Sequence, residues 1–365
     1  MRKDWEYKKW ADVLTIINGK NQKAVESIDG TYPIYGSGGI MGYANDWLCP
    51  ENCTIIGRKG NINKPIFVES KFWNVDTAFG LNSNQNLLAS KYLYYFCLNY
   101  DFNRHNKAVT IPSLTKVDLL KIEMPLPPKP TQLAIVAELD KINELIQLKK
   151  QQLKDYDQLA QSIFYEMFGD PVENEKGWEV KKYGDLFTIG SGGTPSKAKE
   201  EYWNNGDIPW IGSNMCQNRI IYKTDGKYIT KEGLNNSSAK LLMPGTILVA
   251  LVGATIGKVA LLKTETTTNQ NIAFIKVNET KEFMPEYVYY FLMNQYNEFL
   301  NIGNGNFKMA NLSFIKGLFI TKAPLPLQQQ FAARIEAIER QKQQVSETIK
   351  DLETLLASRM QYWFD

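Results

Sequence analysis

A long apolar stripe on an otherwise charged segment, residues 132–168, constrains the fold more than any other feature, and it occurs again near the C-terminus. In both copies apolar residues recur every seven positions, with a second row three residues further on, which is the a/d pattern of paired helices. The predicted pairing residues are Leu139, Ile142, Ile146, Leu153, Tyr156 and Ile163 in the first copy and Ile335, Ile338, Val345, Ile349, Leu352 and Leu356 in the second. We therefore expect two long helices that pack on each other.

The predicted helices are too long for an ordinary globular domain. At ~1.5 Å per residue, the segment 132–168 would form a rod of roughly 55 Å, whereas an average globular helix has about 11–12 residues. Lys149 and Lys342 are the polar interruptions of the two stripes. A rod of this length is typical of a spacer.

The chain also contains an internal repeat that covers its whole length. The string WEYKKWADV from Trp5 resembles WEVKKYGDL from Trp178, and KYLYYFCLN from Lys91 resembles EYVYYFLMN from Glu286. The tripeptide PLP occurs at Pro125 and again at Pro324, directly before each long helix. Because the order is preserved, we interpret the chain as a tandem duplication with a pseudo-two-fold axis.

Each globular half combines strand and helix patterns. Short β-branched runs bounded by Asn-Gly or Asp-Gly pairs predict strands at residues 54–56, 66–68, 247–252 and 273–277. Residues 91–99 and 286–296 carry apolar side chains at helical spacing. The predicted fold class is α+β, with two strand-rich domains separated by a long antiparallel two-helix coiled coil.

Prolines and glycines mark the predicted domain boundaries. The prolines at 125, 127, 128 and 130 predict that the first long helix begins near Thr131, and Gly169 and Pro171 end it. The resulting division is a first domain at 1–128, a spacer helix at 129–170, a second domain at 171–326 and a C-terminal helix at 327–365.

Charge is distributed unevenly between these parts. Lys and Arg exceed Asp and Glu in residues 1–128 (15 against 12) and in residues 171–326 (17 against 14), whereas both helices are acidic. Excess positive charge in the globular halves fits a surface that meets phosphates.

Polar loops supply candidate DNA-contacting residues, because cations and amides suit phosphates and the base edges of the major groove. In the first half the candidates are Arg58, Lys59, Asn61, Asn63, Lys64, Arg104, His105 and Lys107. In the second half they are Ser191, Thr194, Lys197, Asn214, Asn218, Arg219, Asn304, Asn306 and Lys308. The alternative for any one of them is that Asn, Ser and Gly simply form turns.

The sequence offers little for catalysis or metal binding. Cys49 and Cys53 lack the second short-spaced pair of a structural zinc site, so we expect buried, reduced thiols and no metal site. The glycine-rich segment 253–259 is one residue too short for a phosphate loop, and Val259 stands where Ser or Thr should hold magnesium. We expect no catalytic residues. The absence of a signal peptide or long apolar run predicts a cytoplasmic protein without membrane contact.

Several strings together resemble the specificity subunit of type I restriction-modification enzymes, and the resemblance covers the whole chain. They are YPIYGSGGIMGYANDWL from Tyr32, IIGRKGNINKPIF from Ile55, DTAFGL from Asp76, SGGTPSK from Ser191, YWNNGDIPWI from Tyr202 and PLPLQQQF from Pro324.

The resemblance implies that each half is a target recognition domain that binds one part of a split double-stranded DNA target, with the helix pair fixing the gap. It also implies two methyltransferase (M) subunits as partners, joined by restriction/translocase (R) subunits. S-adenosylmethionine, ATP and magnesium would belong to those partners, and this chain would bind no cofactor. Two other hypotheses remain: a DNA methyltransferase or nuclease fused to its own recognition domain, and a coiled-coil protein scaffold.

Overall fold

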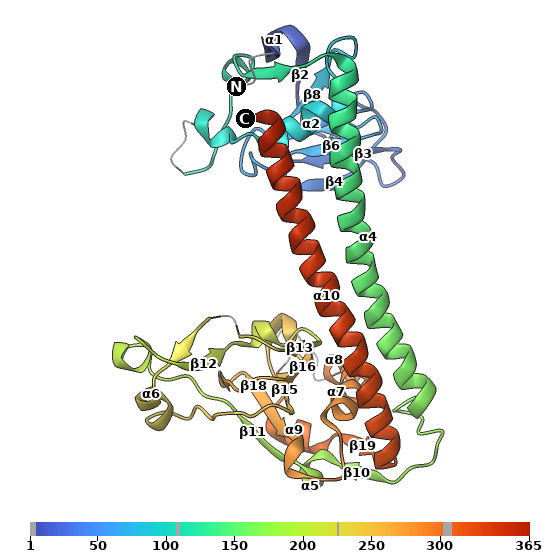
Figure 1. Ribbon diagram of the computed structural model, residues 1–365, viewed down its shortest axis with the longest axis vertical. Coiled ribbons are helices and arrows are strands. Elements are labelled where there is room, and N and C mark those ends of the chain that lie inside the picture. The colour runs from blue at the N-terminus through green and yellow to red at the C-terminus, as the bar shows by residue number, and fades with distance from the viewer. Residues whose placement is uncertain (1–4, 107–109, 225, 302–308) are drawn as a thin grey trace. The chain divides into compact units, whose positions relative to one another are not determined.

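The computed structural model describes residues 5–106, 110–224, 226–301 and 309–365, and these residues form two compact units. Unit 1 comprises residues 1–152 and 345–365, and unit 2 comprises residues 153–344. Each unit contains a strand-rich part and portions of two long helices (Figure 1). The predicted α+β fold class is confirmed.

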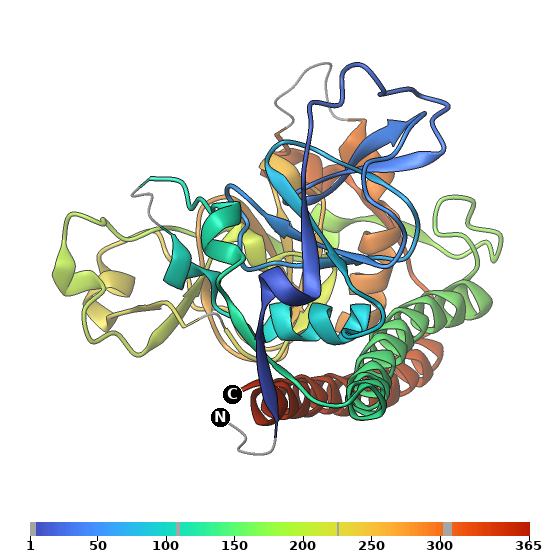
Figure 2. The same ribbon diagram turned by 90° about the horizontal axis from the view of Figure 1, so that it is seen from above.

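Unit 1 is built around an antiparallel sheet in the strand order β2-β8-β5-β6. Its elements, in chain order, are β1 (Glu6–Lys9), α1 (Trp10–Val13), β2 (Leu14–Asn18), β3 (Tyr32–Gly36), β4 (Gly39–Ala44), β5 (Cys53–Gly57), β6 (Ile66–Val68), β7 (Trp73–Asn74), β8 (Ala78–Ser83), α2 (Ser90–Asn99), the 3₁₀ turn η1 (Phe102–His105), α3 (Lys116–Leu119), β9 (Glu123–Leu126) and the start of α4 (Lys129–Phe168). A smaller sheet has the order β4-β3-β7, and β1 pairs with β9. Helix α2 lies beside α4 (Figure 2), and Lys91 and Tyr95 of α2 bond to Asp140 of α4.

Unit 2 repeats this arrangement of sheets and adds one strand, β13 (Arg219–Ile221), to the main sheet. Its elements are β10 (Val180–Lys182), α5 (Tyr183–Leu186), β11 (Thr188–Ser191), η2 (Glu200–Tyr202), β12 (Ile208–Ile211), η3 (Ser213–Met215), β13 (Arg219–Ile221), β14 (Tyr228–Ile229), α6 (Lys231–Asn235), β15 (Thr246–Ala250), η4 (Gly253–Thr255), β16 (Val259–Leu262), β17 (Thr267–Thr268), β18 (Ile272–Lys276), η5 (Val277–Glu279), α7 (Pro285–Asn294), α8 (Tyr296–Leu300), α9 (Leu312–Gly317), β19 (Phe319–Thr321) and α10 (Leu325–Phe364). The main sheet has the order β11-β18-β15-β16-β13, so β13 extends it by pairing parallel to β16.

A buried glutamine at the start of each long helix ties that helix to its globular part. In unit 1 the side-chain oxygen of Gln132 accepts from Ala89 N at 2.8 Å, and its Nε2 donates to the carbonyls of Leu87 and Pro127. In unit 2 Gln328 accepts from Met284 N and donates to the carbonyls of Glu282 and Ala323. Both glutamines are 0% exposed. The duplication therefore extends to individual hydrogen bonds.

The two glutamines also set the register of the repeat. Each donates to the carbonyl five residues before it, so Pro128 of the first copy is equivalent to Pro324 of the second. The two PLP strings therefore do not occupy equivalent positions in the repeat. Helix α4 begins at Lys129, two residues before the position near Thr131 that the prolines indicated, and α10 begins at Leu325. In both helices proline is the second residue, which costs no hydrogen bond because the first-turn N–H groups have no helical partner.

The end of each long helix completes a globular core. In unit 2 Phe168 of α4 packs with its ring centroid 4.7 Å from that of Tyr287, and in unit 1 Phe364 of α10 packs 5.1 Å from Tyr92. Nearby, the ring of Trp5 stacks on that of Trp363 with centroids 6.1 Å apart, so the first described residue lies beside the last turn of α10.

Within each unit the helix portions run antiparallel. In unit 1 Glu138 binds Arg359, and Lys150 lies 2.8 Å from Glu353. In unit 2 Lys342, the interrupting lysine of the second stripe, binds Glu339 and Asp157 at 2.6 and 2.8 Å. Burial alone would lower the pKa of Lys342, but the two carboxylates raise it above the ordinary value.

The predicted pairing residues occupy three environments. Ile142, Ile146, Val345 and Ile349 are buried on the helices. Leu139 belongs to the globular core of unit 1, and Ile335 and Ile338 to that of unit 2. Tyr156, Ile163 and Leu356 are half-buried against these cores, and Leu153 and Leu352 are half-buried.

Candidate nucleic-acid interface

The two candidate clusters of unit 1 lie against each other. The loop after β5 joins the segment before α3, because Gly60 N donates to Pro112 O at 3.0 Å and Leu114 N donates to Arg58 O at 2.9 Å. Gly60 has a φ of +79°, a left-handed conformation that favours glycine. Asn63 then ties this loop to η1.

Both polar atoms of the Asn63 side-chain amide form hydrogen bonds to the segment around η1. Its Nδ2 donates to Asp101 Oδ1 at 3.0 Å, and its Oδ1 accepts from Phe102 N at 2.8 Å. The backbone N–H of Asn103, together with this amide, lowers the pKa of Asp101. Asn63 therefore frames the loop, whereas the sequence suggested it as a base contact.

Exposed cations surround this frame. Arg58 donates to Asp76 O at 3.3 Å and lies 5.9 Å from the ring centroid of Phe79, while Lys59, Asn61 and Lys64 are exposed. The Arg104 guanidinium lies 5.9 Å from the Tyr100 ring centroid, and His105 Nε2 lies 2.7 Å from Tyr100 Oη. Lys107 falls outside the described residues.

In unit 2 the candidate segment 191–197 passes the start of β18 in close backbone contact, since Gly192 N donates to Ile272 O and Gly193 N donates to Thr268 O. A Cβ atom added to Gly192 would stand 2.1 Å from Thr268 Oγ1, and one added to Gly193 would stand 2.2 Å from Ser238 Oγ, so only glycine fits. Ser191 is half-buried in β11, where it pairs with Ala273. Thr194 Oγ1 donates to Gln270 at 2.6 Å.

Lys197 stands apart from that packed segment. Its side chain is exposed and lines a cleft of about 540 Å³ with Trp203, Trp210 and Lys227. Indole rings beside lysines suit stacking and phosphate contact.

The remaining candidates of unit 2 are divided between framework and surface. Asn218 has a φ of +54°, and it exchanges two hydrogen bonds with the Val259 backbone, at 2.9 Å through its own N–H and at 3.0 Å through its Oδ1. Asn214 and Arg219 are exposed, and Arg219 Nη2 contacts the sulfur of Met215. Asn304, Asn306 and Lys308 lie outside the described residues.

A glycine-rich loop of unit 2 has the same backbone anchors as the Arg58 loop of unit 1. Ala310 N donates to Leu251 O at 2.9 Å, as Leu114 N does to Arg58 O, and Gly253 has a φ of +73°, close to that of Gly60. The glycine-rich segment 253–258 of unit 2 therefore stands where the Arg58 loop stands in unit 1. Its Lys258 donates to Gln217 at 3.0 Å. The shared glycine, which lies three residues after the end of β5 in unit 1 and three residues after the end of β15 in unit 2, was the available signal.

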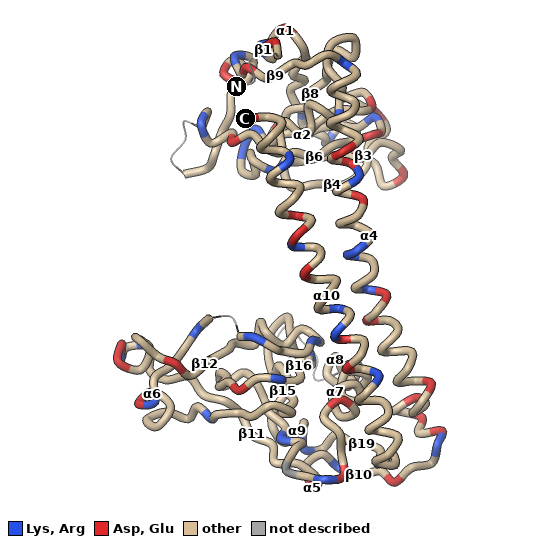
Figure 3. Tube along the Cα trace, in the orientation of Figure 1, with Lys and Arg blue, Asp and Glu red and all other residues tan. Residues whose placement is uncertain are grey.

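Cysteines and carboxylates do not form a metal centre within the described ranges. All four cysteines are free and buried, and burial raises the pKa of the Cys53 and Cys216 thiols to about 12. Acidic and basic residues are interspersed along α4 and α10 (Figure 3). Among the helices that the structure describes, none has the length and apolar character of a membrane span.

The architecture defines a class of duplicated recognition proteins: one α+β framework built twice, with different loop chemistry in each copy and a 40-residue helix after each. The chain belongs to the family described as the type I restriction modification DNA specificity domain, whose model matches residues 2–155 and again 175–354. This match confirms the resemblance seen in the sequence.

Individual relatives agree with this assignment. The chain is 31% identical over 222 residues to the type I restriction enzyme EcoR124I/EcoR124II specificity subunit of Escherichia coli, covering 56% of this chain and 52% of that protein. It is 34% identical over 179 residues to the MjaIX specificity subunit of Methanocaldococcus jannaschii, covering 46% and 40%. The matched part thus spans about half the length of these relatives, or less.

A solved structure supports the fold. The type I restriction-modification S subunit from M. genitalium superposes with a TM-score of 0.60 at 14% identity, covering 100% of this chain and 98% of that one. A chain from work on complex assembly of the type I R-M system gives 0.59 at 16% identity.

Proposed function

We propose that this chain is the non-catalytic DNA-recognition subunit of a type I restriction-modification complex. Each half binds one part of an asymmetric, bipartite double-stranded target, and the long helices fix the gap. The supporting observation is the duplicated framework. The loop that contains Gly60 and the loop that contains Gly253 occupy equivalent positions in the two units but carry different side chains. Two equivalent loops of different chemistry bind different sequences.

The proposed division of labour follows the domain boundaries predicted from the sequence. Residues 1–128 and 171–326 are the target recognition domains, and residues 129–170 and 327–365 are the spacer helices. Two methyltransferase subunits dock on this chain and restriction/translocase subunits join them. Those partners bind S-adenosylmethionine, ATP and magnesium, and the complex works in the cytoplasm.

Charge at the Arg58 loop supports direct contact with DNA. Arg58, Lys59, Lys64 and Arg104 are exposed cations on loops that hydrogen bonds fasten together. Cations on a rigid loop neutralise phosphates at little entropic cost and release counterions. Arginine also suits the bidentate contact with guanine in the major groove.

The test is modified-base mapping in cells that express the chain with its methyltransferase partner. Arg58→Ala should weaken or relax one half-site by about 1–3 kcal/mol and leave the other unchanged. Lys59→Ala should weaken binding to all sequences and lower the salt slope by about one. Lys154→Ala, an exposed helix lysine, is the matched control.

Two outcomes would oppose the proposal. Methyl transfer by the purified single chain would favour a fused enzyme. Affinity for DNA that does not fall with salt would favour a protein scaffold, because phosphate contacts make binding strongly salt-dependent.

A further inference from the structure

The edge of the main sheet differs between the two units. In unit 2 the edge of β16 is covered by β13, with Ile220 opposite Leu261 in a parallel pairing. In unit 1, among the described strands, β6 pairs only with β5 and ends the sheet. An uncovered strand edge presents backbone donors and acceptors that can pair with another chain.

Strand register shows that β6 and β16 are equivalent. Thr54 pairs with both Leu81 and Phe67, and Ile247 pairs with both Ile275 and Leu261. Thr54 and Ile247 each lie four residues before the equivalent residues Arg58 and Leu251, so Phe67 corresponds to Leu261. Two residues further on, Glu69 corresponds to Lys263. Lys91 lies 4.0 Å from Glu69, and Lys263 lies 2.6 Å from Glu286, so the same ion pair occurs with its charges exchanged.

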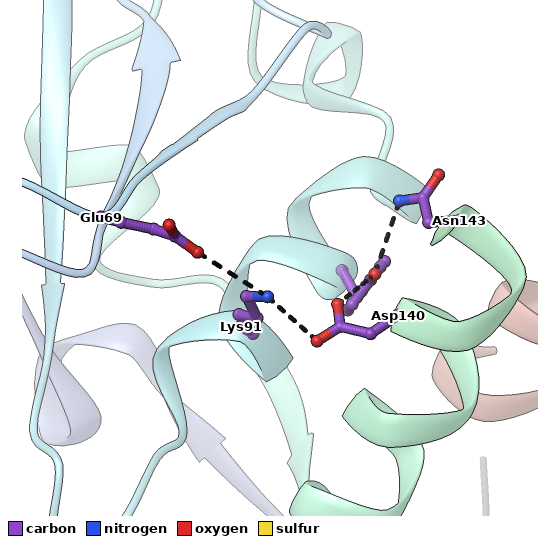
Figure 4. A network of polar contacts seen from close by, with 5 residues as sticks. Glu69, Lys91, Asp140 and Asn143 are labelled. Atoms are coloured by element: carbon purple, nitrogen blue, oxygen red, sulfur yellow. Dashed lines mark hydrogen bonds and ion pairs between the residues drawn. The ribbon is translucent and has the colours of Figure 1, made fainter. Parts of the chain in front are cut away.

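A cleft lies beside the uncovered edge of β6. It has a volume of about 890 Å³ and is lined from three sides: by the end of β6, by α2 and by α4. Figure 4 shows Lys91 between Glu69 and Asp140, and Asp140 also accepts from Tyr95 Oη at 2.7 Å. Three carboxylates, Glu69, Asp140 and Glu144, line the cleft together with one lysine, Lys91, and Glu144 also pairs with Lys141 at 2.9 Å.

Unit 2 shows what fills the equivalent place. Tyr222 follows β13, and burial near Glu339, Glu286 and Glu336 raises its pKa to about 12. Ile220 packs against the core that contains Tyr289, which is 3% exposed, whereas the equivalent Tyr94 of unit 1 is only half-buried. The segment 217–224 that supplies this cover, QNRIIYKT, carries two cations and no carboxylate.

We propose that the cleft beside β6 is a docking site for an extended, basic segment of a partner protein. The segment adds a strand to the edge of β6 and places an aromatic side chain beside Tyr94 and Tyr95. Backbone pairing supplies affinity in this mode of binding, and side-chain pockets supply specificity. The excess of carboxylates selects a basic peptide and repels DNA phosphates. This docking site is separate from the proposed DNA-binding loops.

The probe is a fluorescently labelled peptide with the sequence of residues 217–224, titrated against the full-length chain. We expect saturable binding that the double variant Glu69→Arg/Glu144→Arg weakens by about tenfold or more, since both exposed side chains face the bound cations. Asp29→Arg, an exposed change outside the cleft, should leave binding unaltered. A peptide with N-methylated backbone amides should not bind, because it keeps the side chains but loses the pairing donors.

Hydrogen exchange locates the bound peptide. We expect the amides of Ile66–Val68 to become protected when the peptide is added. The proposal is overturned by an absence of saturable binding, by equal binding to the double variant, or by protection confined to β16. It is also overturned if a DNA duplex competes for the peptide site, or if β6 is protected by self-association alone. DNA affinity of the double variant is measured separately and should match the wild type, so failure here is distinguishable from failure of DNA recognition.

Discussion

A single buried glutamine at the start of each long helix bonds that helix to the globular part of its unit, and we expect both glutamines to contribute to stability. Gln132→Ala removes three hydrogen bonds and leaves Ala89 N, Leu87 O and Pro127 O without that partner in a buried site. We expect a loss of roughly 2–4 kcal/mol in the free energy of unfolding of unit 1, because buried polar groups are costly to leave unpaired. Urea denaturation followed by tryptophan fluorescence measures it.

The duplication supplies the matched comparison for this prediction. Gln328→Ala should cost a similar amount in unit 2, since its three hydrogen bonds are equivalent. Gln158→Ala on the exposed face of α4 should change stability by less than about 0.5 kcal/mol. A loss that small for either buried glutamine would mean that its three hydrogen bonds do not stabilise the unit.

A second residue-level prediction concerns pH. Glu138 accepts from the guanidinium of Arg359 and from Trp363 Nε1, and the hydrogen bond from Arg359 lowers the pKa of the carboxyl. A lowered folded-state pKa stabilises the fold above the ordinary glutamate pKa, and this contribution disappears as the pH falls through the folded value. We expect Glu138→Gln to reduce the pH dependence of unit 1 unfolding between pH 6 and about pH 3.

The exposed Glu347→Gln on α10 is the control for this titration. If both variants retain the wild-type slope of stability against pH, the link between Glu138 and Arg359 contributes nothing in solution.

Residue type selected the candidate loops, but it does not indicate which groups each amide binds within the folded unit. Asn63 and Asn218 were chosen because Asn can bind a base edge, yet both amides hold backbone groups of their own unit. The partner of an amide depends on which distant segment comes within 3 Å, and a single sequence does not contain that distance. The same limit concealed residues 253–258, whose equivalence to the Arg58 loop rests on a backbone hydrogen bond.

At the scale of elements, the last turn of each long helix is a core element. Phe364→Ala removes a ring that packs on Tyr92 and Phe96, and Phe168→Ala removes one that packs on Tyr287 and Phe331. We expect each to cost about 3–5 kcal/mol, the usual range for a buried phenylalanine. Because they belong to different units, each variant should shift only one unfolding transition in calorimetry.

Leu355→Ala, exposed on α10, should shift neither transition. Equal effects of Phe364→Ala on both transitions would mean that the units unfold as one. No effect on either transition would mean that the end of α10 contributes no stability to the core.

Periodicity predicted the elements better than their connections. The strands at 66–68 and 273–277 and the helix at 91–99 occur close to their predicted bounds, because apolar patterning is a local property. The addition of β13 to β16 could not be predicted, because its paired residues, such as Ile220 and Leu261, lie far apart in the sequence and packing decides whether they meet. The identical PLP strings were misleading for a related reason, since the buried glutamine and not the tripeptide fixes the register.

At the scale of the whole molecule, the length of the paired helices should determine which DNA targets are modified. Both α4 and α10 are uninterrupted 40-residue helices, and both contribute to each unit. Removing one heptad from each, residues 147–153 and 346–352, keeps the phase of the apolar rows and shortens each helix by about 10 Å, the rise of roughly three base pairs. We expect the mapped target to keep both half-sites and to lose base pairs from the unread gap.

The comparison that isolates helix length is a deletion from α4 alone. It should abolish modification, because the shortened helix no longer matches α10 and the apolar rows lose their partners. Modified-base mapping of DNA from cells that carry each variant with the methyltransferase subunit distinguishes the cases. An unchanged gap after the double deletion would mean that the helices do not set the spacing, and altered half-sites would mean that the deletion had disturbed the recognition domains themselves.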